Sequence, residues 1–115
     1  TDDLHAHAPF DLVLCDVPCS GSGTWARDPD AKWRFTSEKL AVLNQTQDSI
    51  LESAAPLVSG TGVLAYATCS LFAEENEVRI AAFLKANPGW QCVFSRQWNL
   101  DDGADGFFVA HLRRV

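Results

Sequence analysis

Two kinds of apolar pattern alternate along this chain. Short runs rich in aliphatic and aromatic residues, typical of strands, occupy residues 10–16, 63–68, 90–94 and 107–112. The first two runs are near-continuous and suit buried strands of a parallel sheet. Segments with apolar residues at helical spacing separate the first three runs, from about residue 38 to 57 and from about 73 to 86. The order strand, helix, strand, helix, strand, strand predicts an α/β fold with a mostly parallel sheet and one antiparallel strand.

Local signals mark where the predicted elements begin and end. Ser37 is a suitable cap for the first helix, and the run Ser59–Gly62 is expected to break the chain after it. Residues 17–36 contain glycines, prolines and tryptophans without a regular period, so we expect a long loop there. The second helix opens with three glutamates that favour its positive amino end: Glu74, Glu75 and Glu77.

The composition is that of a chain that can build its own core. Hydrophobic residues make up 47% and charged residues 21% of the 115 residues, which fits one globular domain. The net charge of −6 argues against a basic domain that coats nucleic acid. The sequence has no apolar run of the ~18 residues that cross a membrane and no basic-then-apolar leader, so we expect a cytoplasmic protein with no membrane partner. Met is absent, and we interpret residues 1–9 as a linker or tail, residues 10–115 as one unit, and the chain as a piece of something longer.

The cysteines fall into two kinds. Cys15 and Cys92 lie inside apolar runs and are expected to be buried as small hydrophobic residues. Cys19 and Cys69 each follow a strand-like run, among small polar residues. A disulfide framework is disfavoured because the chain has enough apolar residues for a core. A zinc site is disfavoured because no second close Cys or His pair accompanies Cys15 and Cys19, so we expect no bound metal.

The side chains best suited to catalysis or ligand binding lie at the carboxyl ends of the first two strands. In an open α/β sheet, ligands bind outside these ends. The segments Asp16–Thr24 and Ala67–Ser70 lie there, and a right-handed crossover favours their two strands as neighbours. Taken singly, each residue has an ordinary structural role, such as a turn for Asp16. Two cysteines at matching strand ends, with an acid and a glycine-rich loop, instead predict one crevice where two thiols and a carboxylate converge.

These segments resemble one family. DVPCSGSGT at residues 16–24 resembles motif IV of the Sun-type RNA (cytosine-5)-methyltransferases, the family that includes the bacterial ribosomal RNA small-subunit methyltransferase B type. YATCS at residues 66–70 resembles their motif VI, and DPDAKW, EENE and the terminal DGFFVAHLRR are also similar to the family. The resemblance covers residues 10–114. Pro-Cys-Ser-Gly followed fifty residues later by Thr-Cys-Ser, each after a strand, is highly specific.

The resemblance implies covalent catalysis. C5 of cytosine is a poor nucleophile, and addition of a thiolate to C6 makes C5 electron-rich enough to attack an electrophilic methyl group. By its match to motif VI, Cys69 is the implied nucleophile. Cys19 of motif IV is implied to assist release of the Cys69 adduct, as a general base or through one. Asp16 is implied to contact the ring at N3, and the Pro18 carbonyl is implied to accept from the amino group that distinguishes cytosine from uracil.

The resemblance also implies a methyl donor and an RNA substrate. The donor is S-adenosylmethionine, with Asp16 and Pro18 beside it, but the family's glycine-rich first motif precedes motif IV. The chain therefore looks like the C-terminal half of a Rossmann-like methyltransferase fold, and alone we expect it to bind the donor weakly and to be inactive. Ser20, Arg27 and Lys32 are expected to contact the RNA, which by resemblance is ribosomal; the two cations alternate with aromatic residues that can stack on bases. The bare apolar edge of the first strand is expected to mediate a homodimer.

Three other functions stay open on the sequence. A DNA cytosine-5 methyltransferase would use Cys19 as its nucleophile, but would leave Cys69 without a role. A non-catalytic domain could bind RNA or a partner protein, although both thiols and Asp16 are retained. A thiol hydrolase or redox enzyme would need a histidine partner, and His111 lies in a strand at the far end of the chain.

Overall fold

The structure, a computed structural model, describes residues 7–25, 29–99 and 105–115. Its strands are β1 (Phe10–Asp16), β2 (Val58–Thr68), β3 (Trp90–Trp98) and β4 (Phe107–Arg114). Its α-helices are α2 (Pro29–Arg34), α3 (Ser37–Ala54) and α4 (Glu77–Ala86). Single 3-10 turns occupy Ser22–Thr24, Ala55–Leu57 and Ala73–Glu75.

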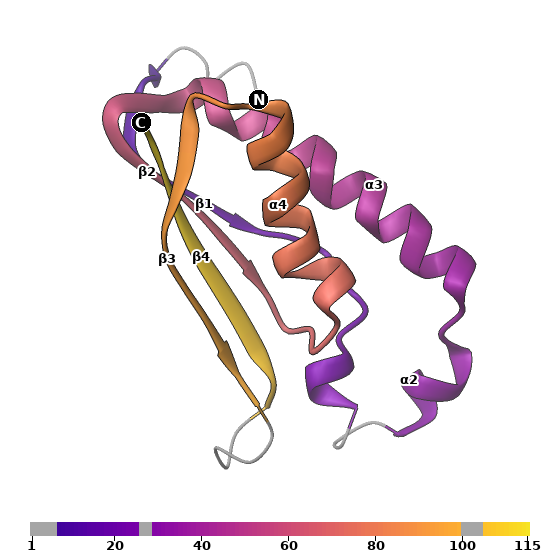
Figure 1. The fold of residues 1–115 in the computed structure, drawn as a ribbon. Helices are drawn as coiled ribbons and strands as arrows, with labels where there is room; N and C mark the ends of the chain where they lie inside the picture. The colour runs from indigo at the N-terminus through magenta and orange to yellow at the C-terminus, as the bar shows by residue number, and fades with distance from the viewer. Residues whose placement is uncertain (1–6, 26–28, 100–104) are drawn as a thin grey trace.

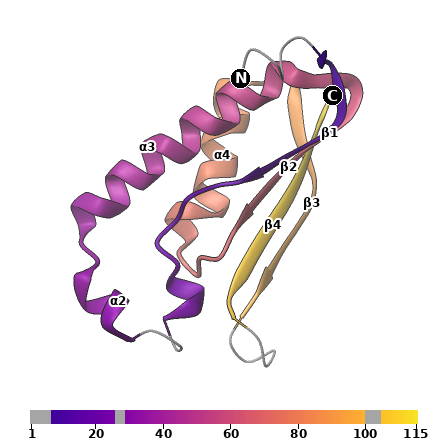
Figure 2. The same ribbon diagram turned by 180° about the vertical axis from the view of Figure 1, so that it is seen from behind.

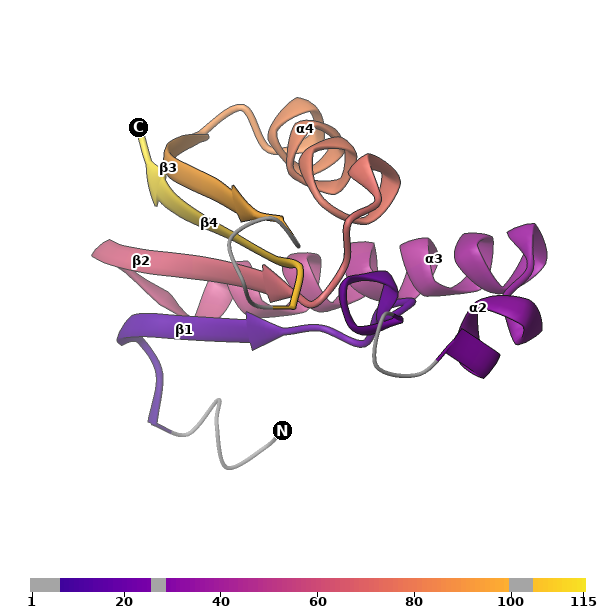
Figure 3. The ribbon, with the colours of Figure 1, turned by 90° about the horizontal axis from the view of Figure 1, so that it is seen from below.

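The strands form one mixed sheet in the order β1-β2-β4-β3 (Figure 1). β1 runs parallel to β2, and β4 runs antiparallel to both of its neighbours, β2 and β3. Figure 3, which views the molecule from below, shows the strands in this order. The predicted α/β fold, mostly parallel with one antiparallel strand, is therefore confirmed, and so is the pairing of the first two strands.

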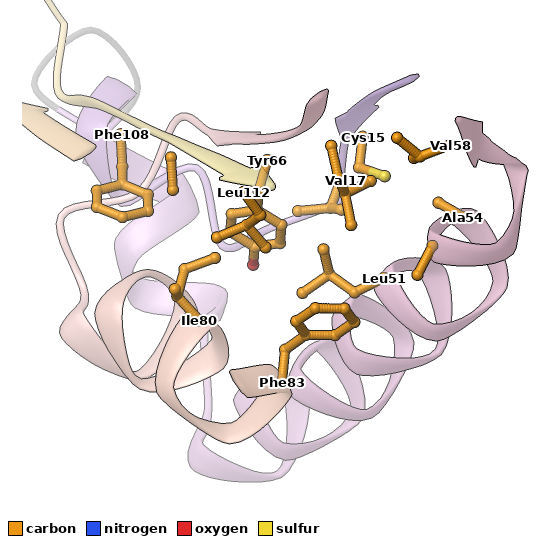
Figure 4. Packing of buried hydrophobic residues seen from close by; sticks show 13 residues of the cluster. Cys15, Val17, Leu51, Ala54, Val58, Tyr66, Ile80, Phe83, Phe108 and Leu112 are labelled. Carbon is orange, nitrogen blue, oxygen red and sulfur yellow. The ribbon is translucent and has the colours of Figure 1, made fainter. Parts of the chain in front are cut away.

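Helices α3 and α4 cover the same face of the sheet, as Figures 1 and 2 show from opposite sides. Between this face and the two helices lies the hydrophobic core, drawn in Figure 4. Its members from the helices include Leu51, Ala54, Ile80 and Phe83, and those from β1, β2 and β4, with the residue after β1, include Cys15, Val17, Val58, Tyr66, Phe108 and Leu112. At ~25 cal/mol per Å² of buried apolar surface, this burial is the main stabilising term of the fold.

β1 is less buried than its apolar sequence suggests. Leu12 and Leu14 are 64% and 62% exposed, whereas Cys15, one position along, is buried against the helices. Successive side chains of a strand point to opposite faces, and no helix in the described part of the chain covers the face on which these leucines lie. β1 is also an edge strand. The prediction of a buried strand therefore holds for one face of β1 only.

Several helix and strand boundaries in the structure differ from the predicted ones. α3 is capped by Thr36, whose Oγ1 accepts a hydrogen bond of 3.2 Å from the Lys39 N–H, and not by Ser37. The 3-10 turn at Ala55–Leu57 ends the helix before residue 57, because it contains a proline that has no N–H to donate. The predicted break at 59–62 is instead the start of β2.

The early start of β2 depends on close packing against β1. Val58 is the register partner of Phe10. A Cβ on Gly62 would lie 2.8 Å from the Asp11 carbonyl oxygen, so only glycine allows the two backbones to approach this closely. Gly60 and Gly62, which suggested a turn, therefore lie within a strand.

Three further expectations are wrong. The predicted loop at 17–36 contains a 3-10 turn and α2, and the second helix is interrupted at Asn76, whose backbone leaves the helical region. Cys92 is exposed, because β3 is an outer strand of the sheet. The pairing of β3 with β4 continues to Trp98. In the part of the chain that the structure describes, no helix combines the length and apolar character needed to span a bilayer.

Candidate active site

The loops that follow β1 and β2 meet at one end of the sheet, because these strands are parallel neighbours with Asp16 opposite Ala67. Two backbone hydrogen bonds join the loops: the Val17 N–H donates to the Ala67 carbonyl at 3.2 Å, and the Gly23 N–H donates to the Cys69 carbonyl at 3.0 Å. Figure 3 shows the 3-10 turn after β1 beside the chain that leaves β2. The two loops therefore lie side by side at the carboxyl ends of the first two strands, as the sequence predicts.

Two thiols face each other where these loops meet. The Sγ atoms of Cys19 and Cys69 lie 3.3 Å apart, within hydrogen-bonding distance, and either thiol can be the donor. Both residues are half-buried. Burial, followed by the hydrogen bond to Cys69, raises the pKa of Cys19 to about 12. Cys19 is therefore available as a hydrogen-bond donor to its neighbour.

Asp16 and Pro18 lie at the end of β1 and in the loop that follows it, close to Cys19 in the sequence. Asp16 is the last residue of β1, its side chain is exposed, and within the described ranges it makes no hydrogen bond to another side chain. The Pro18 carbonyl accepts a hydrogen bond of 2.9 Å from Gln47 Nε2. A carbonyl oxygen has two lone pairs, so one acceptor position is left for a ligand. The predicted roles of these two residues stay predictions.

A buried carboxylate joins the two loops. Glu75 is 0% exposed, and its Oε1 accepts hydrogen bonds from the Ser20 and Ser70 hydroxyls, each at 2.5 Å. Its Oε2 accepts from the Ser20 N–H at 2.8 Å and from Gln47 Nε2 at 3.0 Å. We call this set the serine–glutamate cluster: Ser20, Gln47, Ser70 and Glu75. Ser20, predicted to contact RNA, has its hydroxyl proton engaged here.

Sequence reasoning missed this cluster. Glu75 was expected at the amino end of a helix, where acidic residues are common, and Gln47 lies on a helix with polar neighbours. The signal that could have located Glu75 is its position five residues after Ser70, within reach of the loop that follows β2. Its burial depends on donors that come from elsewhere in the chain, which no local pattern reveals.

A second set of buried polar groups forms hydrogen bonds with the backbone of Glu75 and Ser70. The Tyr66 hydroxyl donates to the Glu75 carbonyl at 2.6 Å, and burial raises the pKa of that tyrosine. Asn76 Nδ2 donates to the Ser70 carbonyl at 2.9 Å, while its Oδ1 accepts from the Thr68 hydroxyl at 2.6 Å. Buried polar groups that are satisfied in this way rigidify the structure around them.

A pocket of about 470 Å³ opens beside Cys19, within the size range of ligand sites. Its lining combines polar and apolar residues: Cys19, Ser20, Phe35, Glu38, Lys39, Val42 and Leu43. Phe35 also packs on Trp25 and Phe72, with ring centroids 5.5 and 5.9 Å away. One wall of the pocket is therefore held by an aromatic cluster.

The basic residues predicted to contact RNA are only partly described. Arg27 lies outside the described residues. Lys32 is exposed on α2, next to Trp33, which is 83% exposed. Lys39 Nζ donates to the Arg34 carbonyl at 2.6 Å. An exposed tryptophan between cations is suited to stacking on an unpaired base, and RNA contact here stays a prediction.

Comparison with known proteins gives concordant results. The family model for the 16S rRNA methyltransferases RsmB/F matches residues 1–113. Ribosomal RNA small subunit methyltransferase B of Proteus mirabilis is 41% identical over 110 residues, which are 95% of this chain and 26% of that protein. The crystal structure of PH0851 superposes with a TM-score of 0.87 at 36% identity, over 94% of this chain and 29% of that one.

A third relative supports the fold alone, because its sequence identity is 24%: the crystal structure of NSun6 from Pyrococcus horikoshii with SFG. The TM-score is 0.81, and the match covers 98% of this chain and 32% of that one. The chain thus spans about a quarter of the length of the curated relatives that it matches.

Proposed function

Because the chain belongs to the 16S rRNA methyltransferase RsmB/F family, we propose that it carries the catalytic residues of an enzyme that methylates C5 of a cytosine in ribosomal RNA in the cytoplasm. The observation that carries the proposal is the thiol pair: Cys19 and Cys69 lie 3.3 Å apart at the carboxyl ends of two adjacent parallel strands. Covalent methylation at C5 needs one sulfur to add to the ring and a further group to help it leave, and two neighbouring thiols are suited to these two roles.

Cys69 is the nucleophile in this proposal. Its thiolate adds to C6, C5 takes the methyl group, and elimination then removes the C5 proton and returns the electrons of the C6–Sγ bond to Cys69. The assignment follows the match of the segment around Cys69 to motif VI of the family. As a donor to Cys69, Cys19 stabilises the attacking thiolate, and at 3.3 Å it is close enough to assist the elimination through a general base that takes the C5 proton.

S-adenosylmethionine would supply the methyl group as an electrophile. Asp16 is placed to meet it, since its exposed carboxylate stands at the end of β1 without an internal partner among the described residues. Pro18 lies beside it and is also exposed. The structure of NSun6, which shares this fold, contains SFG, an analogue of this donor. We propose that residues 10–115 are the C-terminal half of the catalytic domain and that the remaining sites for the donor lie elsewhere in the intact protein.

Recognition of cytosine depends on Pro18 in this proposal. Its carbonyl accepts from Gln47 Nε2 at 2.9 Å, which fixes its direction and leaves one lone pair for the cytosine amino group. Asp16 contacts N3 of the ring. Lys32 and Arg27, with the aromatic residues around them, contact the RNA that flanks the target base, which must leave its stack to reach the thiols.

The test is methyl transfer by the intact protein to unmodified 16S ribosomal RNA that contains cytosine labelled with tritium at C5. Methylation at C5 replaces that atom, so the proposal predicts tritium release in step with methyl incorporation, and loss of both in Cys69→Ala. Methyl incorporation without tritium release would place the reaction at another atom. Incorporation into DNA and not RNA would favour the DNA enzyme instead.

A further inference from the structure

We propose that Glu75 is a positioning residue that sets the spacing of the two thiols by clamping the serines that follow them. The catalytic part of this inference rests on the proposed function. The structural part, that Glu75 sets the distance between the thiols, depends only on the serine–glutamate cluster. Glu75 touches neither thiol, so its effect on chemistry passes through the loops that it holds.

The carboxylate is saturated with donors. Each of its two oxygens accepts two hydrogen bonds, at distances between 2.5 and 3.0 Å. A carboxylate is acceptor-only and offers about four lone-pair positions, all of which are used here. Among the described residues, these partners are uncharged. Charge-assisted hydrogen bonds are about twice as strong as neutral ones, so the cluster is a firm connection between its elements.

The donors come from both catalytic loops. Ser20 directly follows Cys19, and Ser70 directly follows Cys69. Both hydroxyls donate to the same oxygen, Glu75 Oε1, and the two hydroxyl oxygens lie 3.4 Å apart. The separation of the thiols, 3.3 Å, is nearly the same. One oxygen atom therefore fixes the residue next to each thiol.

Cys19 is held from its other side as well. Gln47 Nε2 donates both to Glu75 Oε2 and to the carbonyl of Pro18, the residue before Cys19. The anchor itself is fixed, because the Glu75 carbonyl accepts from the buried Tyr66 hydroxyl and the Glu75 N–H donates to the Phe72 carbonyl at 3.0 Å. A shift of Glu75 would thus move Cys19 and Cys69 relative to each other.

The experiment measures thiol proximity directly. Diamide, an azo oxidant, joins two close thiols into a disulfide, taking two electrons and both thiol protons and becoming a hydrazine. We expect the intact wild-type protein to form the Cys19–Cys69 disulfide, located by peptide mass mapping. Glu75→Gln keeps the shape of the side chain but places an NH₂ group where donors already point, so the rate should fall by about tenfold or more. Glu74→Gln, an exposed neighbour, is the matched control and should keep the wild-type rate.

Ser70→Ala keeps the glutamate and removes one of its four donors, so it covers the case in which Glu75→Gln does not fold. We expect a rate several-fold below wild type, with the thermal midpoint retained within a few degrees. In methyl transfer, kcat per folded molecule should fall in both variants while KM for RNA stays unchanged; the folded fraction is measured under the assay conditions, because loss of folded protein alone would also lower the apparent kcat. Wild-type cross-linking rates in folded Glu75→Gln, or in Ser70→Ala, would overturn the proposal.

The two proposals fail separately. The cross-linking assay contains neither RNA nor methyl donor, so slower cross-linking in the variants supports the positioning role even if the wild type methylates no cytosine. Cytosine methylation by the wild type, together with unchanged cross-linking in the variants, would leave the function standing and refute the role of Glu75.

Discussion

Gly23 is the position where adding a single methyl group should most directly disturb the site. Its N–H donates to the Cys69 carbonyl at 3.0 Å, and its carbonyl accepts from the Gly106 N–H at 2.8 Å. It therefore links the loop after β1 to Cys69 on one side and to the residue that precedes β4 on the other. We consider the variant Gly23→Ala.

The size of the effect follows from the distances. A Cβ on Gly23 would lie 2.3 Å from the Gly106 carbonyl oxygen and 2.7 Å from the Gly106 Cα, whereas ordinary contacts lie between 3.4 and 4 Å. Two stretches of backbone must therefore separate by about 1 Å. Overpacking of this kind costs about 1–3 kcal/mol, and each weakened backbone hydrogen bond adds about 0.5–1.5 kcal/mol. We expect the free energy of unfolding to fall by about 2–6 kcal/mol.

The assay is denaturant unfolding of the variant beside wild type and a matched glycine replacement. Gly60→Ala is the control, because a Cβ there would meet nothing within 4 Å, and it should leave the free energy of unfolding within about 0.5 kcal/mol of wild type. If Gly23→Ala also stays within that range, the close approach of Gly23 and Gly106 does not constrain the folded protein and the reasoning is refuted.

Three further predictions address the core, the pH dependence and the open strand. Gln47→Met removes the donor that serves both a proline carbonyl and a buried carboxylate, so chemical denaturation should show a loss of about 1–3 kcal/mol; the exposed Gln45→Met should be neutral, and equal values for the two would contradict the network. Burial raises the pKa of Cys15 from 9.0 to about 11, so the unfolded chain releases this proton first and the free energy of unfolding should fall as pH rises from 9 to 11. Cys15→Ala should lessen this fall and the exposed Cys92→Ala should not, and a wild-type slope in Cys15→Ala would refute the assignment. The 115-residue chain should self-associate in analytical ultracentrifugation and Leu14→Lys should reduce that association, whereas a clean wild-type monomer at high concentration would exclude it.

The pairing of the first two strands and the meeting of the two cysteine loops could be predicted, because both follow from rules that act locally. Alternating strand and helix patterns imply parallel neighbours, and parallel neighbours bring their carboxyl ends to one edge of the sheet. Cys19 and Cys69 were located in this way, and the structure places their sulfurs 3.3 Å apart.

The burial of Glu75 could not be predicted, because its local surroundings point the other way. A glutamate beside two others at the start of a helix is ordinarily exposed. Glu75 is buried only because Ser20 and Gln47, which lie 55 and 28 residues away in sequence, bring donors to it. Such convergence is a property of the tertiary structure.

Exposure was also misjudged where strands lie at an edge. Cys92 and Leu12 sit in apolar runs, which usually indicate burial, yet both are exposed in β3 and β1, the two outer strands. Apolar character shows which residues can be buried. Whether they are buried depends on which strands lie beside them and which helices pack on each face of the sheet.

The central claim, that Cys69 attacks the base and Cys19 assists release, is tested most directly by trapping the covalent intermediate. The intact protein is incubated with its RNA and S-adenosylmethionine, and protein–RNA adducts that survive denaturation are measured for wild type, Cys19→Ala and Cys69→Ala. We predict that Cys19→Ala accumulates an adduct far above the wild-type level, because release is impaired, and that Cys69→Ala forms none. An adduct in Cys69→Ala, together with none in Cys19→Ala, would reverse the two roles and contradict the mechanism.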